Sequence, residues 1–347
     1  MKAFFENFEK LCGLCGTSGR EDSVRDYIIN EIKGFADVRV DAMGNIIAEK
    51  KGKMRAKNRV MLDAHMDEVA LIVTDINSDG LLSFACVGGI ITAVLCGARV
   101  TVSGKTGVIG GVPIHLLDSD QADSMPDSDS LYIDIGASSK EEALKYVSPG
   151  DIAYFEEDFI EFGRGLIRSK AIDDRFGCAV LMDMIKREQP YDLTFTFSVQ
   201  EEIGLRGAKA AAYGVDPDYA VVIEATTAAD VSGVKPEREV CNVGGGAVIS
   251  FMDSASVYDR GLFELASDVA EENGIKFQIK RAVAGGNNAG SIIRSRGGVK
   301  TAALSLPCRY IHSQASVASR EDILSVAHLA EKLAERLASF SYVPEKI

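Results

Sequence analysis

The spacing of apolar residues changes twice along this chain, and this change restricts the possible folds more than any other feature. Up to about residue 67, and again after residue 166, stretches with helical spacing alternate with short apolar runs typical of strands. Between Glu68 and Gly163, strand-like runs are separated by Gly, Asp and Ser turns, and helical spacing is confined to 138–146. We therefore expect an α/β domain, with a mixed central sheet flanked by helices, from residues 1–67 and 164–347, and a small inserted β-barrel domain from 68–163.

Individual elements follow from the same spacing. Helices are expected at 5–12, 24–32 and 174–186. Ser319, followed by Glu321 and Asp322, is expected to cap a last helix. Strands are expected at 38–41, 46–49, 59–64, 69–74, 81–85, 98–102, 106–110, 131–135, 152–155, 193–199, 219–224, 247–251 and 302–306.

The charge balance limits the partners of the chain. Its 347 residues include 38 Lys and Arg against 51 Asp and Glu, which gives a formal net charge of −13. No long basic run interrupts this acidic excess. Neither nucleic acid nor an anionic membrane surface is therefore an expected partner.

The cellular location is predicted from the N-terminal residues, the apolar runs and the cysteines. Glu6 and Glu9 interrupt the apolar residues at the N-terminus, which does not fit a signal peptide. No stretch reaches the roughly 18 apolar residues needed to span a bilayer. The 7 cysteines are scattered rather than paired, which fits a reducing compartment. We expect a cytoplasmic protein.

Ionisable residues stand at the ends of several expected strands. His65, one of only 4 histidines, closes the strand at 59–64, and Asp67 follows two positions later, where its carboxylate can orient the imidazole. Because open α/β sheets bind ligands at the carboxyl ends of their strands, the fold can bring such residues together. The other candidates at strand ends are Glu201, Glu202, Glu224 and His312, and Asp173 and Asp174 stand at the start of an expected helix.

Two imidazoles and several carboxylates are suitable ligands for borderline divalent metals, and a metal pair activates water for hydrolysis at neutral pH. Each residue taken alone also has a structural explanation. His65 could be a polar strand cap, and Asp174 a helix cap. Glu201 and Glu202 could form a solvated turn, while Glu224 and His312 could be solvated strand ends. Adjacent glutamates on one strand point to opposite faces, which does not suit the acid and base of a glycosidase.

Four segments carry a resemblance to a known family. They are Asp63-Ala64-His65-Met66-Asp67-Glu68, Ala171-Ile172-Asp173-Asp174-Arg175-Phe176-Gly177, Gln200-Glu201-Glu202-Ile203-Gly204-Leu205-Arg206-Gly207-Ala208 and Arg309-Tyr310-Ile311-His312-Ser313. In this order and spacing they resemble the TET-type metalloaminopeptidases, the family that also holds glutamyl aminopeptidases and proteins once labelled cellulase M. The similarity extends over essentially the whole chain and implies a zinc-aminopeptidase-like catalytic domain.

The resemblance implies two divalent metal ions in each subunit, Zn²⁺ or Co²⁺. Asp173 would bridge both ions. His65 and Glu224 would complete one metal site, and Glu202 and His312 would complete the other.

The resemblance also implies the catalytic roles and the activity. Glu201 would act as general base, and Asp67 would support His65. The protein would be an aminopeptidase that releases N-terminal residues from short peptides, and its β insertion would help to build a homo-oligomer, often a tetrahedral dodecamer. Two alternatives stay open: a dinuclear amidohydrolase that acts on acyl-amino acids or dipeptides, and a metal-binding scaffold protein with weak or no catalysis.

The chain departs from the family at two positions. The family commonly has Asp where Glu224 stands, and the extra methylene of Glu would alter metal spacing or affinity. A family Gly-Gly-Thr-Asp-Ala segment appears here as Gly285-Gly286-Asn287-Asn288-Ala289, so an amide replaces an acid at Asn288.

Overall fold

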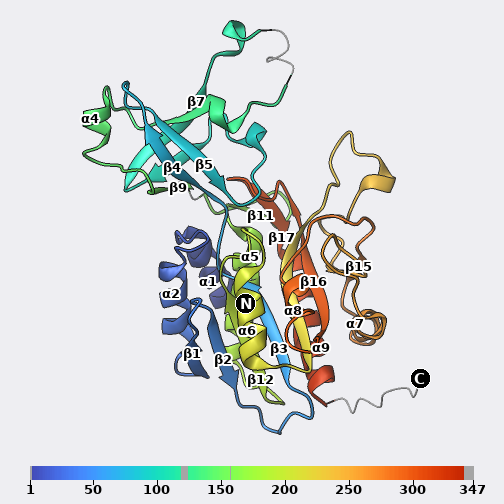
Figure 1. Cartoon of the computed structure of the whole chain (residues 1–347). Coiled ribbons are helices and arrows are strands. Elements are labelled where there is room, and N and C mark those ends of the chain that lie inside the picture. The colour runs from blue at the N-terminus through green and yellow to red at the C-terminus, as the bar shows by residue number, and fades with distance from the viewer. Residues whose placement is uncertain (1, 119–123, 157, 340–347) are drawn as a thin grey trace.

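A large α/β body and a closed β-barrel at one end of it make up the protein (Figure 1). The structure is a computed structural model and describes residues 2–118, 124–156 and 158–339. The strands of the large sheet are β1 (Asp37–Val40), β2 (Ile46–Lys50), β3 (Val60–His65), β10 (Ile160–Phe162), β11 (Leu166–Ser169), β12 (Leu193–Ser198), β13 (Tyr219–Thr227), β14 (Ala247–Ile249), β15 (Phe277–Ile279), β16 (Lys300–Arg309) and β17 (Ser316–Ser319).

The large sheet is mixed, with a parallel centre. Its order is β1-β2-β12-β3-β13-β16-β17-β11-β10, and β14 pairs with β15 and β16. The central neighbours β12, β3, β13 and β16 run parallel to one another, and so do β14 and β15, whereas the other pairs are antiparallel. The carboxyl ends of four adjacent strands therefore meet at one edge of the sheet.

Helices cover both faces of this sheet (Figure 1). Strand β3 shows how the faces divide, because Val60 and Leu62 pack in one core and Met61 packs in the other. Asp63 and His65 share the face of Met61. The core of Val60 includes α1 (Lys2–Gly13), α2 (Asp22–Ile32), α5 (Ile172–Lys186), α7 (Arg260–Glu272) and α9 (Arg320–Ser339), and the core of Met61 includes α6 (Arg206–Val215) and α8 (Ala289–Ile292).

The barrel has its own apolar core, to which Leu71, Val100 and Ile133 contribute fully buried side chains. It closes in the order β4-β5-β8-β7-β6-β9. Its elements are β4 (Ala70–Ile76), β5 (Leu82–Val87), β6 (Arg99–Val102), β7 (Lys105–Gly111), β8 (Leu131–Asp134), α4 (Lys140–Ala143) and β9 (Ile152–Phe155). Short 3-10 helices lie at Thr92–Val94, Ile114–Leu116, Ser128–Ser130 and Pro236–Arg238.

The predicted fold class, a mixed α/β sheet with a small barrel, is confirmed. The predicted strands have counterparts, although β16 is longer than expected and β14 shorter. The four unpredicted strands, β10, β11, β15 and β17, have three or four residues each, a length at which alternation is a weak signal, although β1 and β9 were predicted at the same length. Helices α6, α7 and α8 were also not predicted, although α7 carries an apolar stripe that includes Leu262, Ala266 and Val269.

The barrel strands occupy Ala70–Phe155, and β10 already belongs to the large sheet. The domain boundaries at 67/68 and 163/164 stay a prediction. Among the described residues, no helix combines the length and apolar character that crossing a membrane would require.

Gly207, in the first turn of α6, lies against the residue that follows β12. Asn45 joins the two segments, because its side chain accepts a hydrogen bond from Val199 N (2.9 Å) and donates one to Gly207 O (3.0 Å). A methyl group at Gly207 would lie 2.7 Å from Val199 N, which is a severe overlap with backbone. We expect Gly207→Ala to lower the free energy of unfolding by about 1–3 kcal/mol, measured by urea denaturation.

Gly214 provides the control for this prediction because it lies in the same helix. A methyl group there has only Arg39 Nη2, at 4.0 Å, nearby. Gly214→Ala is expected to stabilise the protein by up to about 1 kcal/mol through helix propensity. Equal effects of the two substitutions would contradict the proposed overlap.

Candidate metal centre

The ionisable residues singled out from the sequence converge at the carboxyl ends of the parallel strands. His65 is the last residue of β3, and Glu224 lies within β13. These strands pair with Asp63 opposite Val222, so His65 and Glu224 stand two positions further along neighbouring strands, on the same face. Glu202 follows β12, and His312 follows β16. The topology thus brings together residues that are far apart in the chain.

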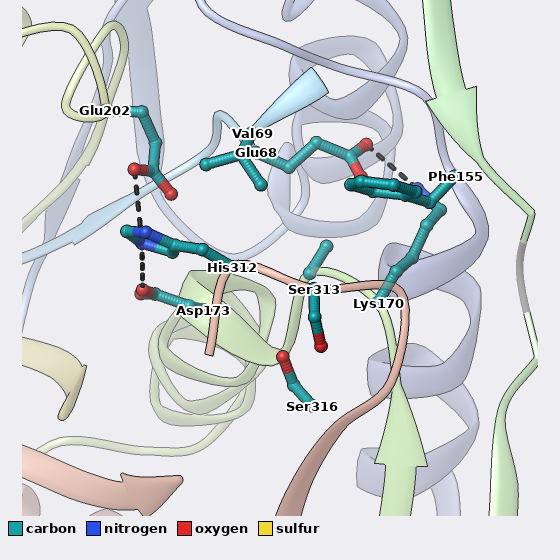
Figure 2. Close-up of a pocket in the computed structure, with 10 residues that line it drawn as sticks. Glu68, Val69, Phe155, Lys170, Asp173, Glu202, His312, Ser313 and Ser316 are labelled. Carbon is teal, nitrogen blue, oxygen red and sulfur yellow. Dashed lines mark hydrogen bonds and ion pairs between the residues drawn. The ribbon is translucent and has the colours of Figure 1, made fainter. Parts of the chain in front are cut away.

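Asp173 lies at the centre of this group, between the two imidazoles. Its Oδ1 is 3.2 Å from His65 Nε2, and its Oδ2 is 3.3 Å from His312 Nε2. Figure 2 shows the side chains of Asp173 and Glu202 on either side of His312. The two oxygens of one carboxylate therefore face two different histidines.

Each histidine has a second carboxylate of its own. His65 Nε2 is 3.4 Å from Glu224 Oε1, and His312 Nε2 is 3.3 Å from Glu202 Oε2. Candidate ligand atoms of His65, Asp173 and Glu202 lie within 4.8 Å of one another. The arrangement has two halves that share Asp173.

Asp174 has a different environment from its neighbour. Its Oδ2 accepts a hydrogen bond from His65 N (3.2 Å), and its Oδ1 accepts one from Gly177 N (3.1 Å). The backbone at Asp173 and Asp174 is not helical, and the peptide bond between them is cis. Asp174 also forms a possible ligand group with His65 and Glu224, but its hydrogen bonds tie it to the backbone of β3 and α5.

Asp67 connects His65 to the turn that carries the two glutamates. His65 Nδ1 lies 3.0 Å from Asp67 O and 3.4 Å from Asp67 Oδ1. The Asp67 carboxylate accepts hydrogen bonds from Glu201 N (3.0 Å) and Glu202 N (3.1 Å). Ser18 Oγ donates a further bond to it (2.5 Å). The link from Asp67 to the glutamate turn was not foreseen from the sequence, because nothing in the local pattern pairs residue 67 with residues 201 and 202.

The barrel also contributes to this centre. Gly89, which follows β5, places its carbonyl oxygen 2.8 Å from His312 Nδ1. If that nitrogen carries the proton, Nε2 is left unprotonated and faces Asp173 and Glu202. The sequence does not predict this contact, because a backbone carbonyl in a loop has no sequence signature.

Burial and the neighbouring carboxylates shift the pKa values of both histidines. Burial alone would lower the pKa of His65, but the nearby Glu224 and Asp173 carboxylates raise that pKa well above its usual value. Burial likewise opposes the shift at His312, where the hydrogen bond to Asp173 and the charge of Glu202 raise the pKa to about 10. Both imidazoles thus lie in a strongly negative environment that favours a bound cation.

The same environment also shifts the pKa values of the carboxyl groups. Burial, together with the charge of Asp173, raises the pKa values of Glu202 and Glu224 well above the usual range. At Asp173 burial is outweighed by hydrogen bonds from His312 and His65, which lower its pKa. The carboxyl groups outnumber the imidazoles, so the buried cluster needs either protons on some carboxyl groups or a bound cation to balance its charge.

A divalent metal fits this set of residues. Oε2 of Glu224 is buried without a hydrogen-bond partner among the described residues, so one oxygen at the centre still needs a positive partner. Imidazole nitrogens and carboxylate oxygens are the ligands that Zn²⁺ and similar ions bind. Glu224, where the family commonly has Asp, nevertheless reaches the cluster, because its Oε1 approaches His65 Nε2.

Asn288 is the second departure from the family pattern, and it contacts Asp63, which precedes His65 by two residues on β3. Its Nδ2 donates to Asp63 Oδ2 (2.9 Å) and to Ser198 Oγ (2.8 Å). Burial raises the pKa of Asp63 to about 6, although hydrogen bonds from Thr196, Ser198 and Asn288 oppose the rise. An aspartate at position 288 would place a second carboxyl group against Asp63, and the amide avoids that repulsion.

Comparison with known proteins decides the family. The model of the M42 glutamyl aminopeptidases matches residues 44–329. The chain belongs to this family. The chain is 33% identical to the lysyl aminopeptidase of Pyrococcus furiosus, and the match covers 98% of this chain and 99% of that relative. It is a metal-dependent aminopeptidase, a hydrolase that acts on peptide bonds, which decides among the three activities considered from the sequence.

Solved structures agree with this assignment of the M42 chain. The TET aminopeptidase of the marine sediment archaeon Thaumarchaeota archaeon SCGC AB-539-E09 matches with a TM-score of 0.92 and 33% identity, over 97% of each chain. The Pyrococcus horikoshii TET1 peptidase, which can assemble into a tetrahedron or a large octahedral shell, matches with a TM-score of 0.82 and 38% identity. That match covers 95% of the M42 chain and 99% of the other.

Proposed function

We propose that this aminopeptidase binds two divalent ions, Zn²⁺ or Co²⁺, and releases single residues from the N-termini of short peptides. The observation that carries the proposal is the position of Asp173, whose two oxygens face two histidines that each have a further carboxylate. Asp173 would bridge the ions. His65 and Glu224 would hold one ion, and Glu202 and His312 the other.

When bound, the ions would supply Lewis acidity, which polarises the scissile carbonyl and makes a water molecule more acidic. Glu201 takes the proton of that water and passes it to the departing amine. Its side chain lines the cavity beside the cluster, and burial, together with the charges of Asp173 and Asp67, raises its pKa to about 7. A carboxyl group with this pKa exchanges protons readily at neutral pH. Asp67 positions His65 and the turn that carries Glu201.

The domain division, assembly and location are part of the same proposal. Residues 1–67 and 164–347 would form the catalytic unit, and 68–163 would serve oligomerisation and substrate access. The Pyrococcus horikoshii TET1 peptidase assembles into a tetrahedron or an octahedral shell, which supports a homo-oligomer, and the tetrahedral dodecamer is the form that we propose. We also propose that the protein is cytoplasmic and that its substrates are short peptides.

Removal of metal tests the core of the proposal. Protein treated with a chelator should lose hydrolysis of short peptides and regain it with Zn²⁺ or Co²⁺, and mass spectrometry should find two ions per chain. Because the ions bind the folded state, metal at about 100 times its Kd should add about 2.7 kcal/mol to the free energy of unfolding. His312→Ala should bind one ion fewer. A single ion in the native protein, or activity that survives chelation, would overturn the proposal.

A further inference from the structure

A cavity of about 280 Å³ extends from the metal centre toward β15 and the segment that follows it. Asp173, Glu201 and His312 line one part of this cavity, and Lys280 and Gly285 line another. Since the peptide bond to be cleaved must reach the first part, the side chain of the N-terminal residue has the rest of the cavity to occupy. The residues around Lys280 therefore line the space that is open to this side chain.

Lys280 is the one lysine or arginine among the described residues that line the cavity. Its side chain is buried, with a relative accessibility of 5%, and its Nζ donates a hydrogen bond to Ala284 O (2.6 Å). Ala284 lines the cavity as well. No carboxylate of the described residues forms an ion pair with this ammonium group, although Asp253 and Glu224 lie near enough to influence it. Burial lowers the pKa of Lys280, as expected for a cation without a close counter-charge.

Two isoleucines, Ile91 and Ile311, also line the cavity, and the rest of the wall is small and polar. Ala225 and Gly286 contribute little side-chain volume, while Thr226, Asn287 and Ser305 contribute hydroxyl and amide groups. No Phe, Tyr or Trp lines the cavity among the described residues. Apart from these two isoleucines, the wall offers little apolar surface to a bulky apolar side chain. A short side chain that ends in a carboxylate would satisfy the free donors of Lys280.

We propose that the cavity selects peptides that begin with Glu or Asp, and that Lys280 binds the carboxylate of that side chain. This inference rests on the proposed function, because the cavity receives the N-terminal residue only if the metal centre cleaves the first peptide bond. Family membership leaves the preference open: the matching family is named for glutamyl activity, whereas the Pyrococcus furiosus relative is a lysyl aminopeptidase.

The first test compares substrates of equal shape and different charge on the metal-loaded native enzyme. Glu- and Gln-p-nitroanilide differ only at the side-chain terminus, as do the Asp and Asn pair. We expect kcat/KM to favour Glu over Gln, and Asp over Asn, by about 10- to 100-fold, the effect of one hydrogen bond to a charged group. Equal values within each pair, or a preference for Leu or Lys, would overturn the inference.

The second test assigns the preference to Lys280. Lys280→Met should reduce kcat/KM for the Glu substrate by about the same 10- to 100-fold while changing that for the Gln substrate little. A residue that only holds the 280–284 segment in place would affect both substrates alike, and that result would contradict the assignment. Lys276→Met is the matched control, because Lys276 is exposed and its Nζ bonds Gly244 O. It should leave the ratio between substrates unchanged.

Binding provides a measurement that does not depend on turnover. Calorimetry should show that metal-loaded enzyme binds glutamate more tightly than glutamine, and that Lys280→Met removes this difference. Hydrolysis of Leu or Ala substrates without any preference for Glu would overturn the role of Lys280 and leave the aminopeptidase proposal standing. Failure to hydrolyse any peptide in the presence of metal would overturn both.

Discussion

Replacing Glu201 by glutamine should lower kcat by about 10²- to 10⁴-fold, the usual contribution of a general acid–base group. Glutamine has nearly the same shape but cannot take a proton from water. The Glu201 backbone N–H, which bonds Asp67 Oδ1 at 3.0 Å, stays in place, so the turn and the neighbouring ligand should not move. Steady-state kinetics on metal-loaded enzyme, with metal content measured in parallel, checks this prediction.

Comparing Glu202→Gln with Glu201→Gln distinguishes the proposed metal ligand from the proposed general base at the adjacent position. Glu202 Oε2 lies 3.3 Å from His312 Nε2, in the group proposed to hold an ion. This variant should lose metal as well as activity, whereas Glu201→Gln should keep two ions per chain. If Glu201→Gln turns over at the native rate, or loses metal as Glu202→Gln does, then Glu201 is not the base.

The general position of this site could be predicted because of the topology of the sheet. His65 ends a strand that begins with the apolar run Val60-Met61-Leu62, and apolar strands lie at the centre of α/β sheets. Strand β3 is buried along its whole length, and His65 is its last residue. The pair Glu201–Glu202 follows from the same reasoning applied to β12, whereas Glu224 was expected to end its strand and lies instead within β13, which continues to Thr227. Strand ends can be read from a sequence when the strands are long and apolar.

The partners within the site could not be predicted in the same way. The spacing of the five candidate ligands matches no short metal motif, so their division between two ions is implied by the family resemblance and not by the residues themselves. The contact of Gly89 with His312 depends on how the barrel is placed against the large sheet. Lys280 follows a three-residue strand and carries no local signal for a binding cavity. Interactions of this kind depend on tertiary placement.

A buried charge network behind the metal centre gives the second large prediction. Glu68 accepts hydrogen bonds from Lys170 Nζ, at 2.6 and 2.9 Å, and from Arg175 Nη2, at 3.2 Å. All three side chains are at most 3% exposed. Figure 2 shows the pair of Glu68 and Lys170 beside the residues of the centre. Glu68→Gln would leave two buried cations without their carboxylate, so we expect unfolding to require about 3–5 kcal/mol less free energy.

Urea denaturation of the metal-free protein checks this value without a contribution from bound ions. Glu161→Gln is the control, because its ion pair with Arg320 is exposed, and such pairs are worth at most about 1 kcal/mol. A loss for Glu68→Gln no larger than that of the control would show that Lys170 and Arg175 find other partners or water.

The network also ties together two segments of the metal centre, the start of α5 and the residues around Asp67. Arg175 follows Asp173 by two residues, and its guanidinium donates to Met66 O (2.9 Å) and Gly16 O (3.2 Å). Met66 and Glu68 flank Asp67, so the start of α5 is tied to both sides of the residue that positions His65. Loss of the Glu68 charge should therefore reduce metal affinity as well as stability. The double variant Glu68→Gln/Lys170→Met, which removes one of the orphaned cations, should recover part of the lost free energy of unfolding.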